Sequence, residues 1–403
     1  MKYLKILIPI LIIALCISPA YSADWNTFQG DIAHHGFEKE CADFVTNLWI
    51  FNLESPIFGS PAIDGDKIFL ASTDGLLKCI DMEDGKEIWS MELNNETYAS
   101  PVIGGDNVYI GSGDTFYAIN KETHKIEWSK QLTGIESTAF VYNKTVFVGT
   151  NSGHLYGFNN ETGKVTVDIE LGGKLKSSPL VVNGTIYIGS TDAKIYAVDT
   201  NGNSKWNYTT GDEILSSPAY GDGRIAIGSS DGNLYVFNET NGNLLFKVNL
   251  NNKVIGSPTI DVHDNSIYIG SDEGNMTCVD LRDGTIKWSH AVGDAVRSTP
   301  ALSENNLAFA SNNGYGYVLN KYTGEEIFTY NPGTVLFSDE ITSSPVIYGN
   351  SLFFAGHDGY LYSLNLEKHE VPASIWLYIV LAIIIVAIVV ISVVAWKFKG
   401  KKN

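Results

Sequence analysis

The strongest constraint on this chain is a unit of about 40 residues that recurs eight times. Each copy opens on a Ser-Pro dipeptide or a close variant, and successive openings lie 38 to 45 residues apart. The openings are Ser60-Pro61, Ser100-Pro101, Ser137-Thr138-Ala139, Ser178-Pro179, Ser217-Pro218, Ser257-Pro258, Thr299-Pro300 and Ser344-Pro345. Such a period predicts a stack or ring of supersecondary units, because one unit alone cannot bury its apolar surface.

The copy from Ser177 to Trp206 shows what one unit contains. Short runs of β-branched and aromatic residues, such as 186–188 and 195–198, alternate with turns rich in Asn, Asp and Gly. These runs predict consecutive antiparallel hairpins, with four strands in each copy. Four-stranded units at this spacing are typical of the blades of a β-propeller.

The two ends of the repeat region predict how a ring would close. The eighth copy ends at Leu366 after only three strands, whereas residues 46–51 carry a fourth-strand pattern with no blade before them. Pairing this N-terminal strand with the eighth copy would remove an open sheet edge. We therefore predict an all-β fold over residues 46–366, an eight-bladed β-propeller of four-stranded blades closed by the N-terminal strand. Seven complete blades with one extra hairpin is the alternative.

Aromatic residues occupy one position near the end of most fourth strands. They are Trp89, Trp128, Trp206, Phe246, Trp288 and Phe328, and Trp49 holds the same position in the N-terminal strand. Val167 stands there in the third copy, which matches the repeat least well. Indoles at a fixed position predict wedges between neighbouring blades, each burying roughly 150–250 Å².

Two apolar segments lie outside the repeats. Residues 1–22 begin with Lys2 and Lys5, continue with an apolar run and end in Ala-Tyr-Ser, as a cleavable signal peptide does. Residues 374–396 carry no charge, are bordered by aromatic residues, and are followed by four lysines in the tail 397–403. This pattern predicts one C-terminal transmembrane helix with a cytoplasmic basic tail and an extracellular propeller. Residues 23–45 would then be a leader segment and 367–373 a juxtamembrane linker.

The charge of the exported part excludes some partners. Without the six lysines of the signal and the tail, 21 of the 27 basic residues remain against 45 acidic ones. A surface this acidic argues against binding nucleic acid or anionic lipid. Beyond the signal, the cysteines are Cys41, Cys79 and Cys278, which do not form a disulfide framework. Cys79 and Cys278 fall at a small strand position of the repeat, so we expect them to pack in the core.

The repeat resembles the pyrroloquinoline-quinone-type repeat, whose pattern is Ala-x-Asp-x-x-Thr-Gly-x-x-x-Trp. Residues 197–206 read Ala-Val-Asp-Thr-Asn-Gly-Asn-Ser-Lys-Trp, and the copy that ends at Trp288 repeats the pattern. The leader residues 25–31 also look like the Trp-x-x-Phe-x-Gly-Asp opening of that family. The resemblance covers residues 25–366 and implies a propeller. It spans quinone-dependent alcohol and sugar dehydrogenases as well as non-enzymatic outer-membrane assembly scaffolds and surface proteins.

The catalytic site that the resemblance implies can be compared with the residues of this sequence. The family's dehydrogenases hold Ca²⁺ with Glu, Asn and Asp beside a catalytic Asp, and most place the quinone between a tryptophan and an adjacent cysteine pair. This sequence has no Cys-Cys dipeptide and no long inserted loop, and its tryptophans are assigned to wedges or to the terminal segments. We therefore expect no cofactor and no catalytic residue.

The sequence thus favours a non-catalytic cell-surface binding or scaffold protein, in an archaeal host. Its partners would be envelope or membrane proteins or glycans. A pyrroloquinoline-quinone-dependent dehydrogenase that uses Ca²⁺, or a sensor of a small ligand or glycan, is the alternative.

The residues that precede the innermost strands form the candidate binding site. In a propeller these loops surround one mouth of the central channel. Tyr98, Glu136, Lys176 and Arg297 stand there, and the two cations are unusual in so acidic a chain. They predict a site for a small anion or an acidic peptide, and solvated side chains without a ligand are the alternative.

No metal site is predicted, and seven glycosylation sequons are present. Asp-Gly turns such as Asp74-Gly75 and Asp231-Gly232 suit tight hairpins and lack the ligand density of a calcium loop. The pair His34-His35 has no third ligand at a recognisable spacing.

The seven glycosylation sequons begin at Asn95, Asn143, Asn160, Asn183, Asn207, Asn238 and Asn275. We expect glycosylation at some of them, in an archaeal or eukaryotic host.

Overall fold

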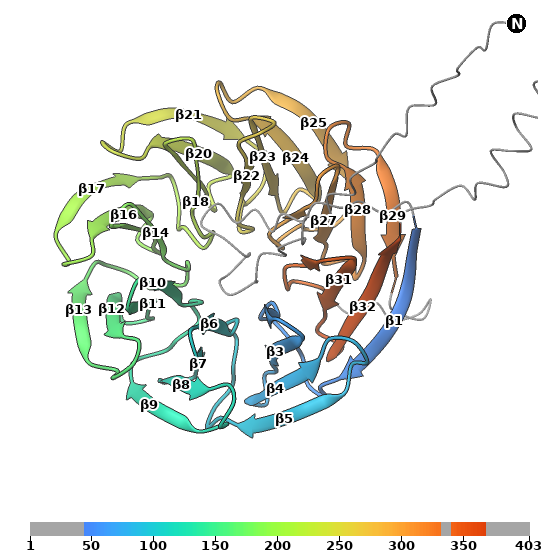
Figure 1. Cartoon of the computed structure of the whole chain (residues 1–403). Helices are drawn as coiled ribbons and strands as arrows, with labels where there is room; N and C mark the ends of the chain where they lie inside the picture. Colours follow the sequence, from blue (N-terminus) through green and yellow to red (C-terminus); the bar gives the residue numbers. More distant parts are fainter. Residues whose placement is uncertain (1–43, 332–339, 368–403) are drawn as a thin grey trace, which may run out of the picture.

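The computed structural model describes residues 44–331 and 340–367. Within these ranges the chain forms eight four-stranded antiparallel sheets and no helix. Figure 1 shows the sheets arranged in a ring, with the first strand of each sheet innermost and the fourth outermost. The predicted all-β, eight-bladed propeller of four-stranded blades is therefore confirmed.

The first four blades follow one another directly along the chain. Blade 1 comprises β2 (Ala62–Asp64), β3 (Lys67–Ala71), β4 (Leu76–Asp81) and β5 (Glu87–Glu92). Blade 2 comprises β6 (Val102–Gly104), β7 (Asn107–Ser112), β8 (Thr115–Asn120) and β9 (Ile126–Gln131). Blade 3 comprises β10 (Phe140–Tyr142), β11 (Thr145–Gly149), β12 (His154–Asn159) and β13 (Val165–Glu170). Blade 4 comprises β14 (Leu180–Val182), β15 (Thr185–Gly189), β16 (Lys194–Asp199) and β17 (Ser204–Thr209).

The remaining blades complete the ring. Blade 5 comprises β18 (Ala219–Gly221), β19 (Arg224–Gly228), β20 (Asn233–Asn238) and β21 (Leu244–Asn249). Blade 6 comprises β22 (Thr259–Asp261), β23 (Ser266–Gly270), β24 (Asn275–Asp280) and β25 (Ile286–Ala291). Blade 7 comprises β26 (Ala301–Leu302), β27 (Asn306–Ala310), β28 (Gly316–Asn320) and β29 (Glu326–Tyr330). Blade 8 comprises β30 (Val346–Tyr348), β31 (Ser351–Ala355), β32 (Tyr360–Glu367) and the N-terminal strand β1 (Phe44–Asn52).

The ring closes through the N-terminal strand. β1 pairs with β32 antiparallel, from Phe44 opposite Glu367 to Asn52 opposite Tyr360, with a bulge between Asn47 and Trp49. β1 begins two residues before the expected boundary at residue 46. Figure 1 shows it as the outer strand of blade 8. The first and last described segments thus share one sheet, and the seven-blade alternative is wrong.

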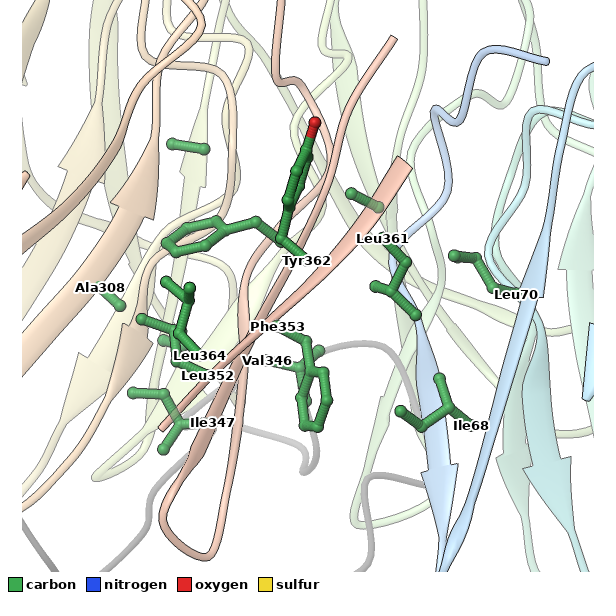
Figure 2. Close-up of a cluster of buried hydrophobic side chains, with 14 of the residues drawn as sticks. Ile68, Leu70, Ala308, Val346, Ile347, Leu352, Phe353, Leu361, Tyr362 and Leu364 are labelled. Carbon is green, nitrogen blue, oxygen red and sulfur yellow. The ribbon is translucent and has the colours of Figure 1, made fainter. Parts of the chain in front are cut away.

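A buried apolar cluster supports this closure. Figure 2 shows side chains of blade 8, such as Phe353 and Leu361, between Ala308 of blade 7 and Ile68 and Leu70 of blade 1. Phe353 and Leu361 are fully buried. The closing blade therefore packs against both neighbours as an interior blade would.

A ring of hydrogen bonds runs through the Ser-Pro openings. The buried backbone N–H of the Ser or Thr that opens one blade donates to the hydroxyl oxygen of the corresponding residue in the next blade. Seven such bonds occur in the described ranges: Ser60 to Ser100 (2.8 Å), Ser100 to Thr138 (3.2 Å), Thr138 to Ser178 (3.1 Å), Ser178 to Ser217 (2.9 Å), Ser217 to Ser257 (2.9 Å), Thr299 to Ser344 (2.9 Å) and Ser344 to Ser60 (2.9 Å). At the remaining junction Thr259 Oγ1 donates to the Pro300 carbonyl instead (2.6 Å). The repeated hydroxyl is therefore an inter-blade link.

The tryptophans lie between blades, as predicted. In the alternate blades 2, 4 and 6 the indole N–H donates to a carbonyl in the next blade, Trp128 to Asn160, Trp206 to Glu239 and Trp288 to Lys321, at 2.9–3.1 Å. A tyrosine of the same blade donates to that same carbonyl in each case. Each indole also covers a glycine of the next blade, so closely that a Cβ there would clash with the ring. In blade 8, Trp49 likewise donates to the Met82 carbonyl at 3.0 Å and covers Gly85, whereas blades 1, 3, 5 and 7 lack this indole hydrogen bond.

The junctions after blades 1 and 3 show two different departures from this pattern. After blade 1, His124, with φ of 57°, takes the place of the covered glycine, and its ring is tilted by 32° against Trp89 with the centroids 4.9 Å apart. The buried Trp89 indole N–H has no hydrogen-bond partner in the described part of the chain. After blade 3, the turn between the third and fourth strands of blade 4 is one residue shorter than in its neighbours, because Val198 pairs with Ser204 whereas Phe237 pairs with Leu244. A Cβ at Gly202 of that shorter turn would meet Ile169 first and Val167 next, so Val167 lies beside the turn. The weakest copy of the repeat therefore coincides with a different turn.

Replacing Ser217 by Ala tests the ring. It would leave the buried Ser178 N–H without an acceptor, so we expect the unfolding free energy to fall by about 1–3 kcal/mol. Ser230 is a matched control, because its buried hydroxyl has no hydrogen-bond partner among the described residues, and Ser230→Ala should change stability by less than about 0.5 kcal/mol. Urea unfolding of the two variants gives the comparison, and equal losses would contradict a linking role for the ring.

Replacing Trp128 and Trp89 by Phe separates the indole hydrogen bond from packing. Both side chains are 8% exposed, but only Trp128 donates a hydrogen bond. We expect Trp128→Phe to lose about 0.5–1.5 kcal/mol more stability than Trp89→Phe. A larger loss at Trp89, measured by the same unfolding assay, would show that packing alone decides the cost.

Candidate binding site on the upper face

The loops that connect each outer strand to the next inner strand lie on one face of the ring, together with the turns between second and third strands. We call this the upper face. Between blades 2 and 3 it holds a hollow of about 380 Å³. Its polar lining comes from residues 93–101, the β7–β8 turn, residues 132–139 and the β11–β12 turn. These side chains are Asn95, Glu96, Tyr98, Asp114, Glu136 and Asn151.

A shortened turn accompanies the hollow. In blade 2, Gly111 pairs with Phe116, five positions further along the chain. In the other seven blades the corresponding partners are six positions apart, as with Gly149 and Leu155. The β7–β8 turn is therefore one residue shorter than its counterparts, and less chain covers the surface beside it.

Glu136 and Lys176 form an ion pair beside the hollow. The Lys176 Nζ lies 2.7 Å from Glu136 Oε2, and Asn151 Nδ2 donates to Glu136 Oε1 at 2.7 Å. Burial by itself would raise the pKa of Glu136, but the Lys176 ammonium and the Asn151 amide outweigh it and hold this pKa below its ordinary value. Glu136 is therefore charged at neutral pH, and Lys176 already has a carboxylate partner.

Two further carboxylates keep an open oxygen. Glu96 Oε2 accepts a hydrogen bond from the Tyr98 hydroxyl (2.7 Å), which raises the pKa of Tyr98. Asp114 Oδ1 accepts one from the Gly134 N–H (2.7 Å). Their second oxygens, Glu96 Oε1 and Asp114 Oδ2, accept no hydrogen bond from the described part of the chain. The lining therefore has unused acceptor capacity.

Tyr98, which lines the hollow, also belongs to a cluster of aromatic rings on the upper face. Phe58 and Tyr98 meet edge to face with ring centroids 5.3 Å apart, although they belong to different loops of the upper face. The two side chains are 38% and 41% exposed. His357 of blade 8 lies against Phe58 at 4.1 Å and shares a hydrogen bond with Thr342.

Arg297 lies at a different junction. Its guanidinium donates two hydrogen bonds of 2.9 Å to the Asp272 carboxylate of blade 6, and these bonds raise its pKa. The structure thus brings Tyr98, Glu136 and Lys176 together near one hollow and places Arg297 four blades away. Both predicted cations are paired with carboxylates. An anion site on Lys176 and Arg297 stays a prediction, and it would require both ion pairs to open.

Several residues of the upper face were not among the predicted site residues. Asn151, Asp272 and His357 each stand two residues after the end of the second strand of their blade, which is the same position of the repeat. In each, the backbone N–H bonds to a loop of the upper face, which aims the side chain at that face. The alignment of the copies contains this position, so it could have been found. Glu96 and Asp114 could not have been found in this way, because their positions depend on the shortened β7–β8 turn.

The acidic turns have structural partners. Asp192, Asp231 and Asp358 each accept a hydrogen bond from the tyrosine four residues later, and Asp231 also accepts one from the Gly211 N–H at 2.7 Å. In the described ranges no group of three His, Cys, Asp or Glu side chains is placed to hold a metal ion. On the lower face, the buried Lys321 pairs with Asp261 at 2.7 Å and Asp264 at 2.8 Å across the junction of blades 6 and 7.

The residues present do not fit the quinone site that the family resemblance implies. The fourth-strand indoles are engaged between blades. Cys79 and Cys278 lie in blades 1 and 6, are almost completely buried, and cannot form an adjacent pair. Burial raises the pKa of Cys79 to about 12 and that of Cys278 to about 11, so both stay protonated thiols in the core.

The predicted sequons differ in accessibility. Asn95, Asn143, Asn183 and Asn207 are exposed. Asn160, Asn238 and Asn275 are half-buried, and the Asn238 side chain accepts hydrogen bonds from the backbone of its own turn. Glycosylation stays a prediction, with the first group better placed to accept a glycan.

The terminal segments lie outside the described residues. These are the predicted signal peptide 1–22, the leader up to residue 43, residues 368–373 of the predicted linker, the predicted helix 374–396 and the tail 397–403, together with Cys41 and His34-His35. Within residues 44–331 and 340–367, no helix is long and apolar enough to cross a bilayer.

Solved structures with this arrangement differ in what they do. BamB from Moraxella catarrhalis is 20% identical, with a TM-score of 0.70 over 80% of this chain and 100% of that one. A computationally designed protein, Ika8, is 17% identical with a TM-score of 0.70 over 78% and 98%. Quinohemoprotein alcohol dehydrogenase from Comamonas testosteroni is 14% identical with a TM-score of 0.73 over 85% and 80%. At these identities the likeness shows the fold alone.

Sequence comparison is more specific. A segment of 64 residues, 15% of this chain, is 36% identical to the human β-alanine-activating enzyme, of whose length the match spans only 6%. A family profile described as "Outer membrane protein assembly factor BamB" matches residues 46–143, 132–330 and 209–377. These ranges cover the whole ring, and the chain therefore belongs to this BamB-like family of propellers built from pyrroloquinoline-quinone-type repeats.

Proposed function

We propose that the protein is a non-catalytic scaffold that binds partner proteins through the upper face of its propeller, at the outer side of a membrane. The profile of its family is described as an outer membrane protein assembly factor, which supports a role in holding other membrane or envelope proteins together. A rigid ring closed at both its inner and its outer strands suits such a role, because little backbone has to become ordered on binding.

One observation carries the proposal. The repeated groups that could do chemistry hold the fold in the described blades: opening serines form the inner ring, indoles lie between blades, and turn carboxylates accept hydrogen bonds from tyrosines. The surface also has a hollow of about 380 Å³ that is lined by the exposed Tyr98, with the exposed Phe58 against that ring. Aromatic side chains are enriched in protein interfaces.

Quinone-dependent reduction of a redox dye tests whether the protein is non-catalytic. The purified full-length chain, titrated with pyrroloquinoline quinone and Ca²⁺ in the presence of alcohols or sugars, should reduce no redox dye above the protein-free rate. A quinoprotein alcohol dehydrogenase under the same conditions is the positive control. Quinone-dependent dye reduction would overturn the proposal.

Photo-cross-linking groups at Asn94 on the upper face and Lys144 on the lower face test the binding part of the proposal. Adducts with other proteins in native membranes are expected from Asn94 alone.

Membrane attachment is the second part of the proposal. The uncharged segment 374–396 and the lysines that follow it support a single span with the propeller outside. Detergent, but neither high salt nor alkaline carbonate, should release the full chain from membranes. A chain ending at residue 373 should appear in the soluble exported fraction. Release of the full chain by carbonate would contradict an integral span.

A further inference from the structure

We propose that the hollow between blades 2 and 3, with Phe58 and Tyr98 beside it, docks a protein segment by accepting a lysine or arginine side chain between Glu96, Asp114 and Glu136. The inference rests on the proposed function, because it names the partner chemistry of the same face. It goes beyond that function in assigning a place on the ring and a charge to the segment that binds.

The shape of the surface limits what can bind there. The hollow of about 380 Å³ lies at the lower end of the range, roughly 300–1,000 Å³, that is typical of binding pockets. It opens where the β7–β8 turn is one residue shorter than in the other blades. A space of this size holds one long side chain, with the rest of the bound segment lying on the surface around it.

The charge of the lining selects a cation. Three carboxylates line the hollow, whereas the nearby cations, Lys176, which pairs with Glu136, and Lys174, are not part of its lining. Glu96 Oε1 and Asp114 Oδ2 retain open lone pairs. An ammonium or guanidinium group could donate charge-assisted hydrogen bonds to both oxygens. An acidic segment would instead meet carboxylates of its own sign.

The aromatic pair supplies the apolar part of the surface. Tyr98 lines the hollow, and Phe58 extends the apolar area from it towards His357 of blade 8. The aliphatic stem of a lysine or arginine can lie on such rings while its charged end reaches the carboxylates. A cation near the face of Tyr98 would also be attracted by the ring itself.

Selection from a random peptide library displayed on phage, against the purified full-length chain, tests the proposal. Peptides with a lysine or arginine flanked by apolar residues should be enriched. In an enriched peptide, replacing that cation by norleucine should weaken binding about tenfold or more, since a charge-assisted pair is lost. The double variant Glu96→Gln/Asp114→Asn should weaken binding to a similar degree. The amide oxygens can still accept from Tyr98 and Gly134, so the double variant removes charge and keeps the fold.

A matched control separates the site from overall charge. Glu273 is an exposed carboxylate on the upper face at blade 6, away from the hollow, and Glu273→Gln should leave binding unchanged. Absence of enrichment, enrichment without basic residues, or equal affinity for the double variant would overturn the proposal. If the double variant still forms the adducts from Asn94 in membranes and no dye is reduced, the scaffold function stands and only this docking site fails.

Discussion

Every blade of this protein depends on a contact with the next one at the innermost point of the ring. At seven of the eight junctions the backbone N–H of one opening residue donates to the hydroxyl of the next, and a hydroxyl is needed there because the N–H is buried. Between blades 6 and 7 the Thr259 hydroxyl makes the link instead. The bond between Ser344 and Ser60 joins residues 284 positions apart and returns the series to its start. Closure by β1 and β32 does the same at the outer edge. The ring is thus closed both at its innermost strands and at its outermost strands, and the apolar packing between blades lies between these two closures.

The sequence was sufficient to predict the features that recur. The Ser-Pro openings predicted eight blades, the incomplete eighth copy predicted that residues 46–51 would close the ring, and the aromatic position predicted the inter-blade wedges. These predictions succeeded because each feature is imposed by the same local geometry in every copy. Even Cys79 and Cys278 could be placed in the core from their position in the repeat.

The features that occur once could not be predicted in this way. The pairing of Lys176 with Glu136 and of Arg297 with Asp272 depends on how neighbouring blades face each other, which no single copy contains. The place of Glu96 and Asp114 depends on a turn shortened by one residue. Its visible sign was the spacing of 38 residues between the second and third openings, the shortest of the series. His124, in the place of a glycine against Trp89, is likewise a property of one junction.

The shortened β7–β8 turn also affects the symmetry of the molecule. A ring of eight similar blades has eight equivalent rotational settings, and a partner that read only the repeated positions would meet the same surface in each of them. One missing residue removes that equivalence, because it gives blade 2 a turn shorter than the corresponding turn of the other seven blades, beside an acidic hollow. A partner that recognises this junction can therefore bind the ring in only one rotational setting about its axis.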